Sequence, residues 1–184
     1  MQAPPGQMTA PPVQALLADG GLAGEWALDP RRSSIRLKSR SMWGLAPVNG
    51  IFSEVSGSGT VSAGGEVSGT VRVAAASIDT RNARRDAHLR SADFFDSGNH
   101  PDITFTVDGI RPSGQGAAAT GALTVRGRTR PLSFAAAASV QGDGEIWLDA
   151  EIHINRADFG LTWNQMGMAS MNNTLTIHTV FARR

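Results

Sequence analysis

The chain has 184 residues, a net charge of +1 at pH 7 and no cysteine. This length suits one well-cored domain, and the near-neutral charge gives no reason to expect nucleic acid or an anionic membrane surface as partner. Without cysteine there is no disulfide, thiolate nucleophile or sulfur-ligated metal. With 21 glycines, 18% charged residues and apolar residues in short alternating runs, the sequence predicts an all-β fold.

Residues 1–24 are predicted to form a flexible N-terminal arm, and residues 25–184 the folded domain. Residues 1–22 contain much Pro, Gln and Gly, so we expect them to be dispensable for fold and binding, with at most one transient helical turn over 13–18. The start lacks the basic residues and apolar core of a secretory signal, and no run is long enough to span a bilayer. We therefore expect a cytoplasmic protein; a true start codon further upstream is the alternative.

Three strands are predicted before residue 77. Ile35 and Leu37 alternate with charged residues over 34–41, which is typical of a strand with one wet face. Residues 42–47 interrupt the strand, because Pro47 cannot donate to a ladder, and a second strand resumes over 48–55. After a glycine-rich hairpin, alternating valines predict a third strand over 67–73.

Residues 77–96 break the strand pattern and predict a short helical lid. Asp79 or Thr80 is suited to cap a first helical turn, and Ser91 to cap a second. The arginines of this segment are expected to be solvated. Three apolar side chains must find cover against the rest of the fold: Leu89, Phe94 and Phe95.

The remaining sequence predicts five further strands. Apolar alternation marks 103–107, and 117–125 with 132–140 form a hairpin around Arg126-Gly127-Arg128-Thr129. The last pair is 145–154 with 174–181. About eight strands with turns at this spacing predict an up-and-down antiparallel barrel or a sandwich.

Runs of small residues over 74–77, 117–120 and 135–139 favour an internal void. A barrel filled by its own side chains would carry more Leu, Ile and Phe there, and an eight-stranded barrel can hold one small ligand. The residues predicted to line the void are Val71, Val73, Val125, Ala75, Gly121 and Ala135. Because 135–138 gives no alternation, Ala136 is the opposite-face alternative, and a close-packed β-sandwich is the alternative fold.

Candidate catalytic and metal-binding residues are few. His88, His100, His153 and His178 lack metal-ligand spacing, and no nucleophile elbow or phosphate loop is present. His88 is expected to bond the backbone or Asp86, and this pair would supply the acid and base of an enzymatic alternative. His153 and His178 fall on the polar faces of their strands.

Arg156 has two interpretations. It pairs with Asp79 or Asp158 and fixes the lid to a strand end, or its charge meets the polar head of a ligand. The methionine-rich loop 163–171 suits either an apolar cavity mouth or simple cover for the barrel end.

Five groups of residues resemble the YceI-like family in type and order. They are Trp26-Ala27-Leu28-Asp29-Pro30 with Ser34; Gly50-Ile51-Phe52; Ser77-Ile78-Asp79-Thr80 with Asp86, His88-Leu89-Arg90-Ser91, Asp93-Phe94-Phe95-Asp96, Pro101 and Ile103-Thr104-Phe105; Gly121 to Gly127; and Arg156 to Leu161. The resemblance extends from about Glu25 to the C-terminus. It implies an extended, lipocalin-like eight-stranded antiparallel barrel whose cavity holds a long isoprenoid chain and catalyses no reaction. Met42-Trp43-Gly44 departs from the His-Leu-Gly of many members, which predicts a different cavity mouth.

The combined prediction is a non-enzymatic barrel that binds, stores or transports an isoprenoid lipid, either a quinone tail or a polyprenyl chain. No cofactor or metal is expected, and a homodimer is left open. The alternatives are an enzyme that uses His88 and Asp86, or an interaction module with a filled barrel. The predicted ligand contacts are Leu37, Trp43, Phe52, Val71, Val73, Phe94, Phe95, Phe105, Val107, Leu123, Val125, Phe159, Trp163, Met166 and Met168.

Overall fold

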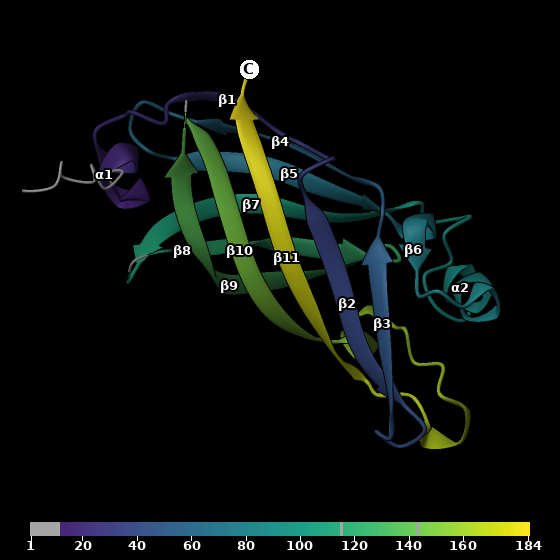
Figure 1. Ribbon diagram of the computed structural model, residues 1–184. Helices are drawn as coiled ribbons and strands as arrows, with labels where there is room; N and C mark the ends of the chain where they lie inside the picture. The colour runs from purple at the N-terminus through teal and green to yellow at the C-terminus, as the bar shows by residue number, and fades with distance from the viewer. Residues whose placement is uncertain (1–11, 115, 143) are drawn as a thin grey trace, which may run out of the picture.

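A single antiparallel sheet forms the wall of the molecule and closes on itself (Figure 1). The computed structural model describes residues 12–114, 116–142 and 144–184. The strands are β1 (Gly24–Leu28), β2 (Ser34–Ser41), β3 (Ala46–Phe52), β4 (Val55–Val61), β5 (Val67–Ala74), β6 (Ile78–Asp79), β7 (Asp102–Ser113), β8 (Gly116–Val125), β9 (Arg128–Gln141), β10 (Glu145–Asn155) and β11 (Asn172–Arg183). The helical elements are α1 (Val13–Ala18), α2 (Ala83–Arg90), η1 (Ala75–Ser77), η2 (Arg156–Phe159) and η3 (Gln165–Gly167).

Strand β11 closes the barrel because three strands pair along its two edges. It pairs with β10 from Asn172 to Phe181. On its other edge, Thr174 to His178 pair with β2 and Phe181 to Arg183 pair with β1. The closed circuit is β1-β4-β5-β7-β8-β9-β10-β11, and β2, β3 and β6 extend the sheet beyond it. The predicted all-β, eight-stranded antiparallel barrel with a short helical lid is confirmed.

The strand boundaries differ from the prediction around Pro47. Strand β3 begins at Ala46 and contains Pro47, which pairs with Arg40 of β2. The opposite edge of β3 pairs with β6 only at Ile51 and Phe52, so Pro47 lies in a strand that is open along most of one edge, where proline is tolerated. The glycine-rich region that follows forms its own strand, β4, in a hairpin with β5.

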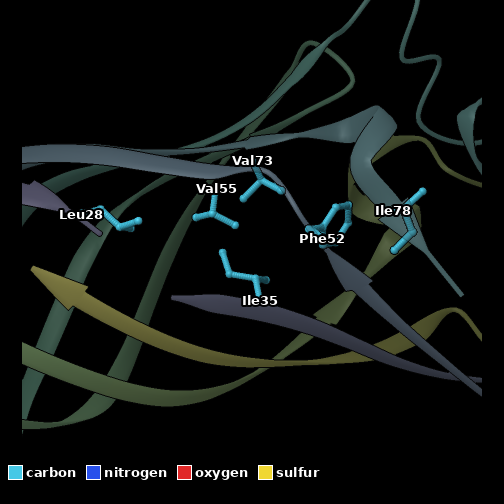
Figure 2. Packing of buried hydrophobic residues seen from close by; sticks show 6 residues of the cluster. All are labelled: Leu28, Ile35, Phe52, Val55, Val73 and Ile78. Atoms are coloured by element: carbon cyan, nitrogen blue, oxygen red, sulfur yellow. The ribbon is translucent and has the colours of Figure 1, made fainter. Parts of the chain in front are cut away.

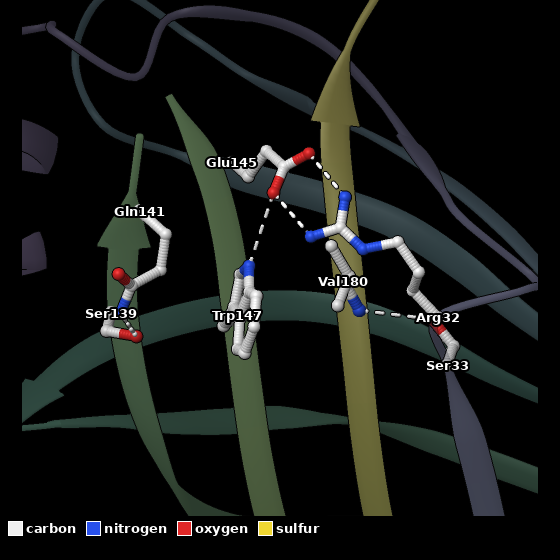
Figure 3. Close-up of polar contacts among 7 residues, drawn as sticks. All are labelled: Arg32, Ser33, Ser139, Gln141, Glu145, Trp147 and Val180. Atoms are coloured by element: carbon white, nitrogen blue, oxygen red, sulfur yellow. Dashed lines mark hydrogen bonds and ion pairs between the residues drawn. The ribbon is translucent and has the colours of Figure 1, made fainter. Parts of the chain in front are cut away.

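An ion pair outside the barrel fixes the connection between β1 and β2 (Figure 3). Arg32 Nη1 and Nη2 donate to the two carboxylate oxygens of Glu145, each at 2.6 Å, and Trp147 Nε1 donates to Glu145 Oε2 at 3.4 Å. Ser33 Oγ accepts from the backbone N–H of Val180 at 3.0 Å. Hydrogen bonding from Arg32 lowers the pKa of Glu145. The ion pair therefore stabilises the fold at pH values above the pKa of this carboxyl group in the unfolded chain. That stabilisation is lost as pH falls through the lower pKa of the folded protein.

Six strands meet in a buried cluster where β2, β3 and β6 leave the barrel (Figure 2). Each of β1 to β6 contributes one residue to it, and these are Leu28, Ile35, Phe52, Val55, Val73 and Ile78. Ile78 has no exposed surface. Because each such side chain contributes roughly 1.5–3 kcal/mol when fully buried, this cluster holds the three-strand extension and the start of the lid segment against the barrel.

Residues 13–24 do not form a flexible arm, contrary to the prediction. Helix α1 lies across one end of the barrel (Figure 1) and joins a buried cluster of Val13, Leu17, Leu22, Trp26 and Val61. Trp26 Nε1 also donates to the carbonyl oxygen of Leu22 at 2.9 Å. Val13 and Leu17 lie four positions apart on one helix face, and so they reach the barrel end together. Residues 1–11 of the predicted arm lie outside the described residues.

Helix α2 starts later than the sequence predicts. Its N-cap is Asn82, whose side-chain oxygen accepts from the backbone N–H of Arg85 at 3.0 Å. Thr80 instead donates to Asp86 Oδ1, from its backbone at 3.0 Å and its hydroxyl at 2.5 Å. Ser91 begins a run of turns rather than a second helical turn. The predicted lid is therefore one helix followed by a turn segment.

We expect Leu22→Ala to lower the free energy of unfolding by about 2–4 kcal/mol, because Leu22 is only 2% exposed between α1 and the barrel. Chemical denaturation followed by tryptophan fluorescence measures the change. Ala18→Ser, at an exposed position of the same helix, is the control and should shift stability by less than about 0.5 kcal/mol. Equal unfolding curves for the two variants would mean that this segment does not stabilise the barrel.

Candidate functional site: the cavity inside the barrel

The barrel encloses a cavity of about 830 Å³ that reaches from α1 to the lid. Val13 and Leu17 line it at one end, and Leu89 and Phe94 line it at the other. The volume lies within the range of roughly 300–1,000 Å³ that is typical of small-molecule sites. The barrel is therefore hollow, which excludes both the filled barrel and the close-packed sandwich that the sequence left open.

The cavity wall is apolar because successive strands direct alternate side chains inward. Strand β10 contributes Ile146, Leu148, Ala150, Ile152 and Ile154, and β11 contributes Leu175, Ile177, Thr179 and Phe181. None of these was among the predicted ligand contacts. The alternation visible over 145–154 and 174–181 was the signal that could have identified them.

Small residues line the cavity, but only some of them are the predicted ones. Val71, Val73 and Val125 face inward as expected, with Ala117, Ala119, Ala136, Ala138 and Ala150. Ala135 is exposed on the outer face, and the buried Ala75 and Gly121 lie outside the described lining. A run of alanines shows no alternation, so the sequence could not tell which of its side chains face inward. The pairing of Ala117 with Ala136 decides this.

Most of the predicted ligand contacts lie together on the cavity wall. These are Leu37, Phe52, Val71, Val73, Phe94, Phe95, Phe105, Val107, Leu123, Val125, Phe159 and Trp163. Trp43 and Met166 are instead 65% and 77% exposed, and Met168 is half-buried but not part of the lining. That the lining residues contact a ligand stays a prediction.

Aromatic rings close the lid end of the cavity. The ring of His88 lies edge-on to Phe94 and Trp163, with centroids 5.1 and 4.4 Å away, and Phe95 packs edge-on to Phe52 at 5.9 Å. Phe94 is 8% exposed. The predicted apolar cover for the phenylalanines is thus provided by the cavity rim and by the loop that carries Trp163.

Arg156 is buried beneath this aromatic cover and bonds carbonyl groups rather than a carboxylate. Its Nε donates to Ser170 O at 2.9 Å, and its Nη1 donates to Leu161 O at 2.5 Å and to Trp163 O at 2.9 Å. The predicted pairing with Asp79 or Asp158 is therefore wrong. Burial lowers the pKa of Arg156. The side chain holds together the loop that follows β10 and also lines the cavity.

The proposed catalytic pair of His88 and Asp86 does not form. His88 Nε2 lies 2.9 Å from Asp93 Oδ2, whereas Asp86 is buried and engaged by Thr80. The expected His88–Asp86 bond is therefore wrong. Without a shared proton path between these two groups, the geometry gives no support to the enzymatic alternative.

The other histidines lie on the outside of the barrel or beside the lid. His178 Nδ1 contacts Asp149 Oδ1 at 2.7 Å, and His153 Nδ1 contacts Thr174 Oγ1 at 3.1 Å. Across 12–114, 116–142 and 144–184, no group of three His, Cys, Asp or Glu residues is placed to hold a metal ion. In the same ranges no helix is long and apolar enough to cross a membrane.

The family model for the YceI-like domain matches residues 26–181. Among curated relatives, Protein YceI of Escherichia coli O157:H7 is 36% identical over 113 residues, a match that covers 58% of each chain. The UPF0312 protein of Pectobacterium atrosepticum is 38% identical over 107 residues, or 55% of each chain. These matches therefore span less than two thirds of the relatives' length.

Solved structures with the same fold cover more of the chain. BcnA of Burkholderia cenocepacia has a TM-score of 0.75 and 21% identity, over 83% of this chain and 98% of that one. A polyisoprenoid binding domain from Saccharophagus degradans, implicated in plant cell wall breakdown, has a TM-score of 0.71 and 16% identity, over 86% and 98%. The YCEI protein of Campylobacter jejuni has a TM-score of 0.64 and 29% identity, over 74% and 85%.

We expect Ala136→Phe to fill part of the cavity at little cost in stability. In a filled core the same change would overpack and cost roughly 1–3 kcal/mol, but Ala136 faces empty space. Uptake of the neutral apolar dye Nile red, measured by fluorescence, should fall. Ala135→Phe, one residue away on the outer face, is the matched control and should leave dye uptake unchanged. A large loss of stability with unchanged dye uptake in Ala136→Phe would contradict the cavity.

Proposed function

We propose, from the premise that this chain belongs to the YceI-like family, that its barrel binds one isoprenoid lipid and so stores or transports it. The ligand is a quinone tail or a polyprenyl chain, and no covalent chemistry takes place. The observation that carries this proposal is the apolar cavity of about 830 Å³, covered by α1 at one end and by the lid at the other.

The physical chemistry of the cavity wall supports a long apolar ligand. Removing apolar groups from water contributes about 0.8 kcal/mol for each CH₂, so one five-carbon isoprene unit supplies up to about 4 kcal/mol before ordering costs. A chain of several units therefore needs few polar contacts. The cavity is lined from α1 at one end to the lid at the other, which suits an extended chain rather than a compact ring system.

The structural relatives support the shared barrel. The Saccharophagus degradans domain is described as polyisoprenoid binding and shares the fold at 16% identity. Because so low an identity speaks for the fold and not for the ligand, the isoprenoid assignment rests on the cavity of this chain and on its family membership.

Native mass spectrometry of gently purified protein tests the proposal. We expect a retained apolar mass in the wild-type protein, and a lower occupancy in Phe95→Ala, because Phe95 covers the cavity against Phe52. Phe95→Leu keeps an apolar cover and should retain more ligand than Phe95→Ala. Both variants are first checked for an unchanged fold by circular dichroism. A wild-type barrel that stays empty, and that takes up no added prenyl quinone or polyprenol, would disprove the proposal.

A further inference from the structure

The charged residues of the cavity wall are all positive. Its described lining includes four arginines, and no Asp or Glu residue belongs to that lining: the arginines are Arg40, Arg84, Arg85 and Arg156. They come from β2, α2 and η2, so all of them lie at the lid end. Arg40, Arg84 and Asn82 are exposed although they line the cavity. We take this end as the mouth, because two charged side chains of its lining, Arg40 and Arg84, also meet solvent.

The positive charge at the mouth is only partly offset by the protein. Arg156 is 8% exposed and is satisfied by carbonyl dipoles, not by a carboxylate. Arg85 bonds Thr80 through Nε at 2.7 Å and Nη2 at 2.9 Å, and Thr80 in turn bonds Asp86. Within the described part of the chain, neither Arg84 nor Arg40 forms an ion pair with a carboxylate.

An anion at this end would therefore meet unneutralised charge beside an apolar wall, where electrostatic attraction is less screened than in bulk water. A neutral head, such as a hydroxyl or a quinone carbonyl, would gain hydrogen bonds but no net attraction. We propose that the ligand is an amphiphile with an isoprenoid tail and an anionic head, a phosphate or a carboxylate, seated between α2 and the β2–β3 hairpin. This inference rests on the proposed function and narrows its ligand class.

Three ligands with the same twenty-carbon tail separate the head groups: geranylgeranyl phosphate, geranylgeranoic acid and geranylgeraniol. We expect the two anions to displace Nile red at concentrations at least about tenfold lower than the alcohol needs. One charge-assisted hydrogen bond is enough to raise affinity by this factor. In the variant Arg40→Gln with Arg84→Gln, this preference should fall below about threefold, while affinity for the alcohol stays the same. Arg85 and Arg156 are left intact because they hold the lid and the loop.

The control variant is Arg31→Gln with Arg111→Gln. It removes the same charge from exposed positions that lie outside the cavity lining and should keep the preference for anions. Equal affinity of the wild-type protein for all three ligands overturns the anionic head and leaves the lipid carrier standing. Binding of none of the three ligands overturns the proposed function itself.

A different observation concerns four exposed apolar side chains, which we call the apolar tip: Met42, Trp43, Leu45 and Met166. They are 54%, 65%, 83% and 77% exposed, respectively. Backbone hydrogen bonds join the two loops that carry them, from Trp43 N to Met168 O at 3.2 Å and from Ser170 N to Arg40 O at 2.9 Å. In Figure 1 both loops lie at the same extremity of the molecule.

The turn itself does not explain these side chains. Met42, Trp43 and Met166 adopt positive φ angles of 51°, 55° and 53°, a conformation that is unfavourable for side chains other than Gly, Asn or Asp. Turn residues of ordinary hairpins avoid this cost with Asn or Gly. Large apolar groups are thus held in solvent at a conformational cost, which indicates a partner surface.

The chemistry around the tip identifies that surface as a lipid bilayer. The stretches 39–47 and 163–171 contain no Asp or Glu, and Arg36 and Lys38 lie on the outward face of β2 beside them. Trp at the edge of an apolar patch with nearby cations is typical of a membrane-water interface. We propose that the apolar tip inserts into an anionic bilayer, which places the adjoining cavity mouth at the lipid surface. The net charge of +1 for the whole chain does not reveal that the surroundings of the apolar tip are basic.

Co-sedimentation with vesicles of phosphatidylcholine and phosphatidylglycerol, 70:30, tests the docking. We expect the wild-type protein to bind these vesicles more strongly than pure phosphatidylcholine vesicles. The variant Trp43→Ser, Leu45→Ser, Met166→Ser should lose at least about tenfold in partitioning, since three partly inserted apolar side chains together exceed 1.4 kcal/mol. Ile51→Ser, 36% exposed on the neighbouring strand, is the control and should bind as the wild type.

Two results would overturn the docking proposal. One is equal vesicle binding by the triple variant and the wild type. The other is a wild-type dimer in light scattering that the triple variant converts to a monomer without any vesicle binding by either protein, because the tip would then be a contact between two copies of the chain. Soluble folded protein in both forms is verified beforehand by circular dichroism.

Discussion

The pairing of β1 and β2 on one edge of β11 is the constraint on which the rest of the structure depends. Closure satisfies the backbone hydrogen bonds around the circuit without any contribution from the interior. The wall can therefore stand around a space that its own side chains do not fill. The buried cluster of Leu28, Ile35, Phe52, Val55, Val73 and Ile78 stabilises the junction of the extension with the barrel, so packing is concentrated at the seam and the ends.

The two ends of the cavity are covered in physically different ways. At one end α1 supplies a purely apolar plug against Trp26 and Val61. At the other end the cover consists of aromatic rings over a buried guanidinium, and Arg156 exchanges its hydration for the carbonyl groups of one loop. A buried charge costs free energy unless it is hydrogen-bonded. The lid end thus carries a buried charge, whereas the buried cluster at the α1 end is apolar.

Because only the lid end carries charged side chains in the cavity lining, the two ends of the barrel are chemically different. An apolar tail is matched by the deep wall, a charged head by the arginines at the mouth, and a lipid surface by the exposed side chains beside the mouth. The three features belong to neighbouring segments, namely the β2–β3 hairpin, α2 and the loop before β11. Under the proposed function, this adjacency would let an isoprenoid tail pass from a bilayer into the cavity without crossing water.

The sequence by itself determined the all-β class, eight of the strands and part of the cavity wall. Period-two alternation records which side chains share a face, as for Val71, Val73, Phe105 and Val107, and the resemblance of ordered motifs fixed the family. Only the tertiary structure decided the facing of the alanine run, since Ala135 and Ala136 differ solely in how β8 pairs with β9. It also decided that Val13, Leu17 and Leu22 fold onto the barrel, that His88 meets Asp93, and that Arg156 bonds carbonyl groups. These outcomes depend on contacts between segments far apart in the chain, which local composition and spacing do not encode.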